Sequence, residues 1–537
     1  MFMVKYYLLI TILCFAAVVA IPNLLLKVVC GWVGISIFLV TIAYLYNIPS
    51  IFKKNEDGKI VWWIRWAFIP FLLGVKAYNA WSRSRDKIPA IHHVAPNLYV
   101  SRRLLSSEIS ELKKHNVNSI VDVTAEFAGL ESAIIDKQFD YFTIPVLDHT
   151  VPTTEQLKHA LNWIDTQIAQ DKAVVVHCAL GRGRSVFVVA AYLLSKDPHL
   201  TVEQALDRIH NVRSTARLNK RQLRALHKLR NEGELEQVSA VWLIANPVSG
   251  AGAWHRYGKR IIDRLTTEYP LKIKFTSKDI SAEELTKEAM ANNAGLVVAA
   301  GGDGTLSEVA NMLVGSDVRF GAIPLGTANT LCHVLYGGEI KVFPVEKPCE
   351  AILSGQEKKI DIAYCNEKLM LLVLGIGFEQ KMIEYAEREK KNQSGQLAYL
   401  NGFFNSLAQN TPIDLTYQQD DSAEQSLSVS SLVVANTAPF TTVLAQGGPM
   451  PEPSDGLLHI TYLEGTQSVG ERLLALSDIT LSALDVREKA QRFTYNCAQR
   501  VVISAPQPFD YVVDGEPFTA DRLVVTIKRN ALTICTL

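Results

Sequence analysis

Three residues within one short segment have the side chains needed to cleave a phosphate ester. Cys178 follows the apolar run 173–177, and Arg184 and Ser185 come after a glycine-containing loop. The run predicts a buried strand and the apolar residues after Ser185 predict a helix, so Cys178 would lie between a strand end and a helix N-terminus. There, backbone N–H groups and the helix dipole lower a thiol pKa from about 8.5 to below neutrality. We therefore expect Cys178 to be a thiolate nucleophile, and Arg184 to hold the phosphate together with the loop N–H groups.

The spacing His-Cys-x5-Arg-Ser over residues 177–185 resembles the signature of the cysteine-dependent dual-specificity phosphatases. The resemblance covers roughly residues 95 to 230, where strands and helices alternate in the manner of an α/β domain. It implies that Cys178 forms a phosphocysteine intermediate, that Ser185 helps the thiolate to leave in the second step, and that no metal takes part. The implied substrate is a phosphoprotein or the phosphate of a phospholipid.

The same resemblance implies an acid upstream of the cysteine that protonates the leaving oxygen. Residues 144–152 resemble the acid loop of the family, which makes Asp148 the candidate. Asp122 and Asp140 are competing carboxylates. Asp122 lies inside a predicted strand and Asp140 precedes one, whereas Asp148 falls in a predicted loop, so we favour Asp148.

A basic segment at residues 212–226 resembles the closing helix of these phosphatases. The segment is either a solvated basic face or a surface that recognises an acidic head group. Its basic residues are Arg213, Arg217, Lys220, Arg221 and Arg224.

Three further apolar runs each end in a turn rich in glycine or small residues. The runs at 240–245, 295–300 and 320–323 lead into Asn-Pro-Val-Ser-Gly, Gly-Gly-Asp-Gly-Thr and Pro-Leu-Gly-Thr-Ala-Asn-Thr. The C-terminal ends of strands form the ligand crevice of an open parallel sheet, so the three turns are predicted to converge on a phosphate site. A helix predicted at 306–313 would point its N-terminus toward that site.

Together with Asp-Gly-Glu at 514–516, these turns resemble the diacylglycerol kinase catalytic family, in particular its bacterial lipid-kinase branch. The resemblance spans about 300 residues and includes the segments 391–399 and 449–456. It implies an α/β nucleotide-binding domain followed by a β-rich lipid-binding domain. It also implies ATP as the phosphoryl donor, Mg²⁺ as a cofactor and a membrane lipid as the substrate.

The lipid-kinase resemblance also assigns individual roles. Asp303 would help to place Mg-ATP, and Glu516 would accept the proton of the lipid hydroxyl. The local pattern of residues 514–516 by itself favours a simple hairpin turn between two strands. Asp455, with Glu452 and the Leu457 carbonyl, matches a second Mg²⁺ site of some relatives, and it also fits an ordinary turn. The residues that match nucleotide contacts are Asn246, Thr276, Gly301, Gly302, Asp303, Gly304, Thr305 and Thr327.

Residues 6 to 52 carry a single charged residue, Lys27, over a length that allows two membrane spans of about 20 residues each. We expect a transmembrane helical hairpin with arms at 6–26 and 28–46, followed by an aromatic interfacial helix within 60–75. A cleaved signal peptide is the alternative. Basic residues crowd the downstream flank, which predicts a multi-pass protein of the cell membrane with its catalytic domains in the cytoplasm.

Composition agrees with this layout. The 537 residues are 48% hydrophobic, which is slightly more apolar than an ordinary soluble enzyme. Lys plus Arg and Asp plus Glu balance at 54 each, which argues against nucleic acid as a partner. The 8 cysteines have neither disulfide-framework nor zinc-site spacing.

The predicted organisation is an anchor, a phosphatase domain and a lipid-kinase domain. The expected bounds are 1–87, 88–231 and 238–537, with the kinase divided into 238–358 and 359–537. We expect a membrane-anchored bifunctional enzyme. The alternative is a phosphatase that is regulated by a non-catalytic, lipid-sensing kinase-like domain.

Overall fold

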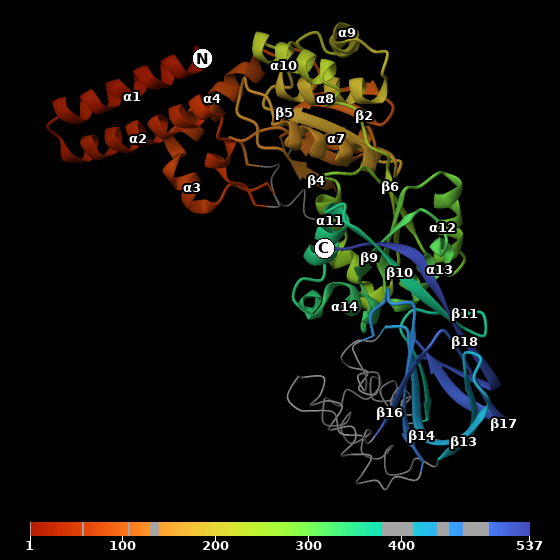
Figure 1. The fold of residues 1–537 in the computed structure, drawn as a ribbon. Helices are drawn as coiled ribbons and strands as arrows, with labels where there is room; N and C mark the ends of the chain where they lie inside the picture. The colour runs from red at the N-terminus through yellow and green to blue at the C-terminus, as the bar shows by residue number, and fades with distance from the viewer. Residues whose placement is uncertain are drawn as a thin grey trace. The chain divides into compact units, whose positions relative to one another are not determined.

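The structure is a computed structural model that describes residues 2–55, 58–105, 108–128, 139–377, 412–437, 451–465 and 493–537. The chain forms two compact units (Figure 1). The first contains Met1–Ala240 and Ile262–Ile273, and the second contains Val241–Ile261 and Lys274–Leu537. The predicted anchor and the predicted phosphatase domain therefore belong to one compact unit.

Two apolar helices open the first unit. α1 (Phe2–Ala20) and α2 (Leu24–Tyr46) lie side by side as a hairpin, and the side chain of Asn23 caps the N-terminus of α2 (Figure 1). Among the described residues, one helix, Leu24–Tyr46, is long and apolar enough to cross a membrane, and Val4–Ala20 is a shorter apolar helix. This gives weak support to membrane association, while the second span and the topology stay predictions.

The stretch after the hairpin forms short helices. These are η1 (Pro49–Phe52), α3 (Trp62–Ala67) and α4 (Ile69–Ser84). The aromatic stretch that we expected as one interfacial helix is thus two, because Pro70 starts a new helix rather than continuing α3. The indole of Trp32 in α2 donates a hydrogen bond to the Ala67 carbonyl at 3.2 Å, which ties α3 to the hairpin.

A five-stranded sheet forms the centre of the phosphatase region, in the order β1-β2-β5-β3-β4. β1 pairs antiparallel with β2, and the other neighbours are parallel. The strands are β1 (Ile91–Ala95), β2 (Leu98–Arg102), β3 (Val117–Asp122), β4 (Asp140–Thr143) and β5 (Ala173–Cys178). The α/β architecture expected from the sequence is confirmed.

Among the described residues of this region, five helices accompany the sheet. β5 and the first eleven residues of α8 are buried throughout, because their apolar runs lie at the centre of the core. α7, α9 and α10 each begin with a capping box, at Thr153, Thr201 and Asn219. The helices are α5 (Ile109–Lys114), α7 (Thr154–Ile168), α8 (Arg184–Lys196), α9 (Val202–Val212) and α10 (Lys220–Asn231).

The α/β region predicted to bind nucleotide follows, and from Val241 onward all of it except Ile262–Ile273 belongs to the second unit. Its strands are β6 (Val241–Ala245), β7 (Leu271–Phe275), β8 (Leu296–Gly301) and β9 (Arg319–Pro324). β6, β8 and β9 are parallel neighbours and almost wholly buried. The helices are α11 (Ser249–Leu265), α12 (Ala282–Ala291), α13 (Asp303–Leu313), α14 (Thr330–Tyr336), η3 (Gly338–Lys341) and α15 (Glu346–Leu353).

The remainder of this unit is rich in strands, as expected. The strands are β10 (Glu357–Cys365), β11 (Lys368–Met370), β12 (Val373–Gly377), β13 (Ile413–Gln419), β14 (Gln425–Ala435), β15 (Leu458–Glu464), β16 (Thr494–Ala498), β17 (Arg500–Val513) and β18 (Glu516–Cys535). β18 pairs with β17 and β10 and also reaches β9, where Ile534 lies opposite Phe320. The last strand thus joins both halves of the unit into one sheet.

Some predicted features lie outside the described residues. They are the motif at 391–399 and the first two residues of the motif at 449–456.

Candidate active sites

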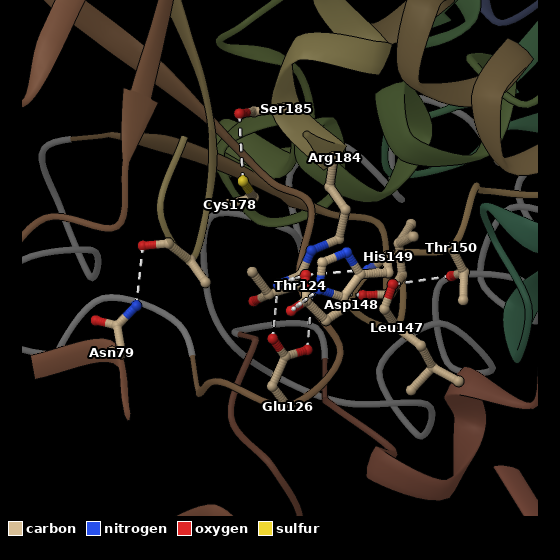
Figure 2. A network of polar contacts seen from close by, with 12 residues as sticks. Asn79, Thr124, Glu126, Leu147, Asp148, His149, Thr150, Cys178, Arg184 and Ser185 are labelled. Atoms are coloured by element: carbon tan, nitrogen blue, oxygen red, sulfur yellow. Dashed lines mark hydrogen bonds and ion pairs between the residues drawn. The ribbon is translucent and has the colours of Figure 1, made fainter. Parts of the chain in front are cut away.

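Cys178 is the last residue of β5, and a short loop joins it to α8, so it lies at the strand end before the helix N-terminus, as the sequence predicted (Figure 2). Its side chain is buried, and its Sγ accepts hydrogen bonds from Gly181 N–H at 3.3 Å and from Ser185 Oγ at 3.4 Å. Gly181 has a φ of +66°, and a Cβ there would approach the backbone of Ser101 within 2.7 Å. Only glycine fits this position, so the loop can curl around the sulfur.

Arg184 points into the same site and is 2% exposed (Figure 2). Its two terminal nitrogens bind the Glu126 carboxylate at 2.7 and 2.8 Å, and one also donates to the Val146 carbonyl at 2.8 Å. The Arg184 Nε has no hydrogen-bond partner among the described residues. A buried guanidinium that is fixed on one edge and open at Nε is suited to hold a phosphate oxygen.

Asp148 is the one predicted acid that the structure brings to Arg184 (Figure 2). Its Oδ1 lies 3.3 Å from an Arg184 terminal nitrogen, and its side chain is 44% exposed. The two competing carboxylates are engaged elsewhere. Asp140 pairs with Lys172 at 2.7 Å, and Asp122 is buried at the end of β3.

Asp122 forms a buried network behind the catalytic loop. It binds Lys54 Nζ at 2.8 Å and accepts hydrogen bonds from the hydroxyl groups of Tyr141 and Thr124 at 2.7 and 2.6 Å. Burial alone would raise the Asp122 pKa, but the Lys54 charge and these hydrogen bonds hold it below its ordinary value. Burial lowers the pKa of neighbouring His177 to about 4. His177 is therefore neutral at physiological pH, and Lys54 supplies the positive charge.

The basic residues of the segment that follows α9 fall into a buried and an exposed group. Arg213 is fully buried, and its guanidinium donates to the carbonyls of Gly181 and Leu180 at 2.7 and 3.0 Å. For Arg213, the prediction of a solvated face or a head-group contact is wrong, because its buried guanidinium binds backbone carbonyls of the Cys178 loop. Arg217, Lys220, Arg221 and Arg224 are exposed.

In the second unit, the three glycine-containing turns converge as predicted. Asn246 donates to the Thr305 hydroxyl at 3.2 Å, and Gly302 N–H donates to Ser249 Oγ at 2.8 Å. A Cβ on Gly326 would lie 2.5 Å from the Gly302 Cα. The turns after β6, β8 and β9 therefore touch at one end of the sheet, where their backbone N–H groups can face phosphate.

A cavity of about 280 Å³ adjoins these turns. Asn246, Thr276 and Thr305 line it, together with residues 277–282. Asp303 begins α13, and Thr327 is exposed in the turn after β9. The predicted nucleotide contacts are thus distributed over the same three turns and the wall of this cavity.

The Asp-Gly-Glu motif forms the hairpin turn between β17 and β18, the reading that its local pattern favoured. Asp514 is partly buried, and its carboxylate accepts hydrogen bonds from the N–H groups of residues 371–373 at 2.7 to 2.9 Å. Burial raises the pKa of Asp514 to about 6, and the nearby Asp303 charge adds to the shift. Glu516 is 64% exposed and pairs with Lys368 at 3.0 Å.

Comparison with known proteins separates the chain into two parts. Residues 98–232 match the family of dual specificity phosphatase catalytic domains, and residues 240–365 match that of diacylglycerol kinase catalytic domains. The chain joins a phosphatase domain to a lipid-kinase domain. A kinase domain of this kind implies ATP as the phosphoryl donor.

The relatives differ between the two domains. A diacylglycerol kinase of Bacillus subtilis is 25% identical over 51% of this chain and 88% of its own length. The human dual specificity protein phosphatase 9 is 32% identical over 22% of this chain and 31% of its own length. An uncharacterized protein of Synechocystis is 35% identical over 51% of this chain and 65% of its own length. The alignment thus spans less than two thirds of this last relative.

The second metal site predicted in the kinase domain has no support from the local contacts. Asp455 Oδ2 lies 2.8 Å from His459 Nε2, and Asp455 Oδ1 accepts the Leu457 N–H at 2.9 Å. Across the described ranges, no group of three or more His, Cys, Asp or Glu residues is placed to hold a metal ion. Asp303 and Asp514 are the carboxylates that lie within electrostatic range of each other beside the glycine turns.

Three residues of the phosphatase site were not predicted from the sequence. Glu126 orients Arg184, Lys54 neutralises Asp122, and Asn79 donates to the Ala179 carbonyl at 3.2 Å. No local motif marks them, because each lies far along the chain from its partner. Lys54 is one of the basic residues downstream of the predicted membrane spans, and its position there indicates no role in the phosphatase site.

Proposed function

We propose that this chain is a membrane-anchored enzyme that hydrolyses a phosphomonoester at Cys178 and phosphorylates a lipid hydroxyl from ATP in its second unit. The observation that carries the proposal is the phosphatase site. A buried sulfur accepts two hydrogen bonds from its loop, and a fixed guanidinium with an open Nε faces the Asp148 carboxylate. This arrangement supports phosphoryl transfer to sulfur.

In the first step, Cys178 Sγ attacks phosphorus while Asp148 gives its proton to the leaving oxygen. Arg184 holds the phosphoryl oxygens, and Glu126 keeps the guanidinium in place. In the second step, Asp148 takes a proton from water, the water oxygen binds phosphorus, and the Sγ–P bond breaks. The Ser185 hydroxyl stabilises the departing thiolate.

In the kinase domain, the phosphates of ATP would lie against the N–H groups of the three glycine turns. Asp303 and Asp514 carry the carboxylates that suit Mg²⁺, which would neutralise phosphate charge during transfer. Glu516 would take the proton of the lipid hydroxyl, and diacylglycerol or a similar acyl lipid is the substrate.

α1 and α2 would cross the membrane as a hairpin, with both catalytic domains in the cytoplasm where ATP is available. A second candidate is a kinase domain that binds lipid without turnover. The observation in its favour is that the Glu516 carboxylate, the proposed base, already forms an ion pair with Lys368 of β11.

The test uses the purified full chain in detergent micelles with labelled ATP and a lipid extract, beside an aryl phosphate assay. Cys178→Ser should abolish aryl phosphate hydrolysis and leave lipid phosphorylation intact. Glu516→Gln should lower lipid phosphorylation at least 100-fold, since general base catalysis contributes about 10² to 10⁴ in rate. Lipid binding without any phosphorylation by the unaltered chain would establish the sensor instead.

A further inference from the structure

The segment that carries the apolar helices also contacts the catalytic loop of the phosphatase domain. Asn79 of α4 donates its side-chain N–H to the Ala179 carbonyl, next to Cys178, at 3.2 Å (Figure 2). Lys54, which follows η1, is 3% exposed in its ion pair with Asp122, itself 1% exposed. Both contacts are buried, so they hold the catalytic loop and the N-terminal segment together as one body.

Apolar packing fixes the other two loops of the site to the same segment. Ala125 and Leu147 precede Glu126 and Asp148 directly, and both are fully buried. They belong to an apolar cluster with residues of α2, η1, α3, α4 and the links between them, which are Val40, Ala43, Phe52, Ile60, Ile64, Phe68, Phe71 and Leu72. Glu126, which orients Arg184, and Asp148, which supplies the proton, are therefore held in place by apolar packing against the N-terminal helices.

The tyrosines of the hairpin reach the site as well. The hydroxyl groups of Tyr7 in α1 and Tyr44 in α2 lie within electrostatic range of Glu126 and Asp148. Their rings contact each other edge to face, with centroids 5.5 Å apart. The phosphatase site is thus bordered on this side by the two apolar helices themselves.

The outer face of the same segment has the composition of a membrane interface. Trp62, Trp63 and Trp66 of α3 are 73%, 57% and 63% exposed. Aromatic residues of this kind, beside an apolar helix such as α2, are typical of the boundary between lipid head groups and hydrocarbon. The face is therefore suited to lie at the surface of a bilayer.

On the α10 side of the site, exposed positive charge suits an anionic surface. Arg217 N–H donates to the Arg182 carbonyl of the catalytic loop at 2.8 Å, and Asn219 donates to the His149 carbonyl of the acid loop at 3.0 Å. Arg217, Lys220 and Arg221 are exposed there and have no ion-pair partner within the part of the chain that the structure describes. Basic residues of this kind are attracted to the negative surface potential of an anionic membrane.

We propose that the phosphatase domain acts on a phosphomonoester carried by a membrane lipid, and not on a phosphoprotein. The inference rests on the proposed Cys178 chemistry. Because α2–α4 hold all three catalytic loops, the site stays at the level of the head groups, where lipid phosphate is concentrated. Cys178 takes the phosphoryl group as the P–O bond breaks, Asp148 protonates the lipid alcohol that leaves, and water then releases inorganic phosphate.

The experiment compares substrates for the full chain reconstituted in phosphatidylcholine vesicles. The probes are phosphatidic acid or phosphatidylglycerol phosphate in the same vesicles, a soluble phosphotyrosyl peptide and a soluble aryl phosphate. The test variant is W62S/W66S, which removes two exposed aromatic side chains of α3. The matched control is V342S/F343S, which removes an exposed apolar pair, 71% and 48% exposed, from the other unit.

We expect the unaltered chain to have a higher kcat/KM for a vesicle-borne lipid phosphate than for the peptide. W62S/W66S should lower the ratio of lipid to aryl phosphate turnover at least tenfold, whereas the control should leave it unchanged. A preference for the peptide, or an unchanged ratio in W62S/W66S, overturns the inference while the proposed function stands. If no probe, the aryl phosphate included, is hydrolysed in a Cys178-dependent manner, the proposed function itself fails.

Discussion

Replacing Lys54 by methionine should destabilise the phosphatase unit severely, although Lys54 lies outside the matched phosphatase region. The change keeps most of the aliphatic stem and removes the charge that faces Asp122 at 2.8 Å. At an effective dielectric constant of about 20, two unit charges at that separation attract by about 6 kcal/mol, and desolvation offsets part of this. Leaving one partner of a buried pair without the other costs about 3 to 5 kcal/mol.

This loss can be measured by urea unfolding of the full chain in micelles, followed through its aryl phosphatase activity and tryptophan fluorescence. With an m-value of about 2 kcal/mol/M, the midpoint should fall by about 2 M. Lys53→Met is the matched control, because Lys53 is the exposed neighbour. The double variant K54M/D122N should recover more than half of the loss, since it removes both buried charges.

Equal midpoints for K54M and K53M would refute the reasoning, because Asp122 would then not depend on Lys54. A double variant as unstable as the sum of K54M and D122N would refute it as well. In that case the two side chains would contribute to stability independently of each other.

Three other changes test the sites separately. Asp148→Asn should slow hydrolysis most for phosphates with poor leaving groups, since only those need the proton, and equal losses on good and poor leaving groups would identify another acid. Gly326→Ala should raise the KM for ATP at least tenfold, because its Cβ would lie 2.5 Å from Gly302 Cα, whereas Gly295→Ala meets nothing within 4 Å and should have no effect. Asp514 has a folded-state pKa of about 6 against an ordinary 3.8, so the folded state binds its proton more tightly. The free energy of unfolding should therefore fall by about 3 kcal/mol as the pH rises through that window, and Asp514→Asn should remove this slope in urea unfolding measured across it.

The Cys178 loop and the glycine turns of the kinase domain could both be predicted from the sequence. The chemistry of the Cys178 loop depends on residues that are close together in the chain. Cys178, Arg184 and Ser185 lie within one strand–loop–helix unit, where backbone geometry alone brings the sulfur, the guanidinium and the hydroxyl together. The glycine turns were predictable for a related reason. Parallel strands place all their C-terminal ends at one edge of a sheet, so three such turns must converge.

The side chains that pair with Arg184 and Asp122 could not be predicted from the sequence and are seen only in the tertiary structure. Glu126 pairs with Arg184 across 58 positions and Lys54 pairs with Asp122 across 68, and no periodicity or motif encodes such pairings. Arg213 shows the same limit. Its sequence context is that of a solvated basic helix, yet the chain turns it inward, where a charged side chain is stable only because backbone carbonyls accept its hydrogen bonds.

The apolar segment before the phosphatase domain could be predicted from the sequence, because hydropathy is a local property. That the same segment packs under the loops of Glu126 and Asp148 depends on apolar contacts between residues far apart in the chain. Burial of Ala125 and Leu147 against α2–α4 is a non-directional effect of area and shape, so it leaves no signature in the spacing of residues. Only the tertiary structure shows that the predicted anchor packs against the loops of the phosphatase site.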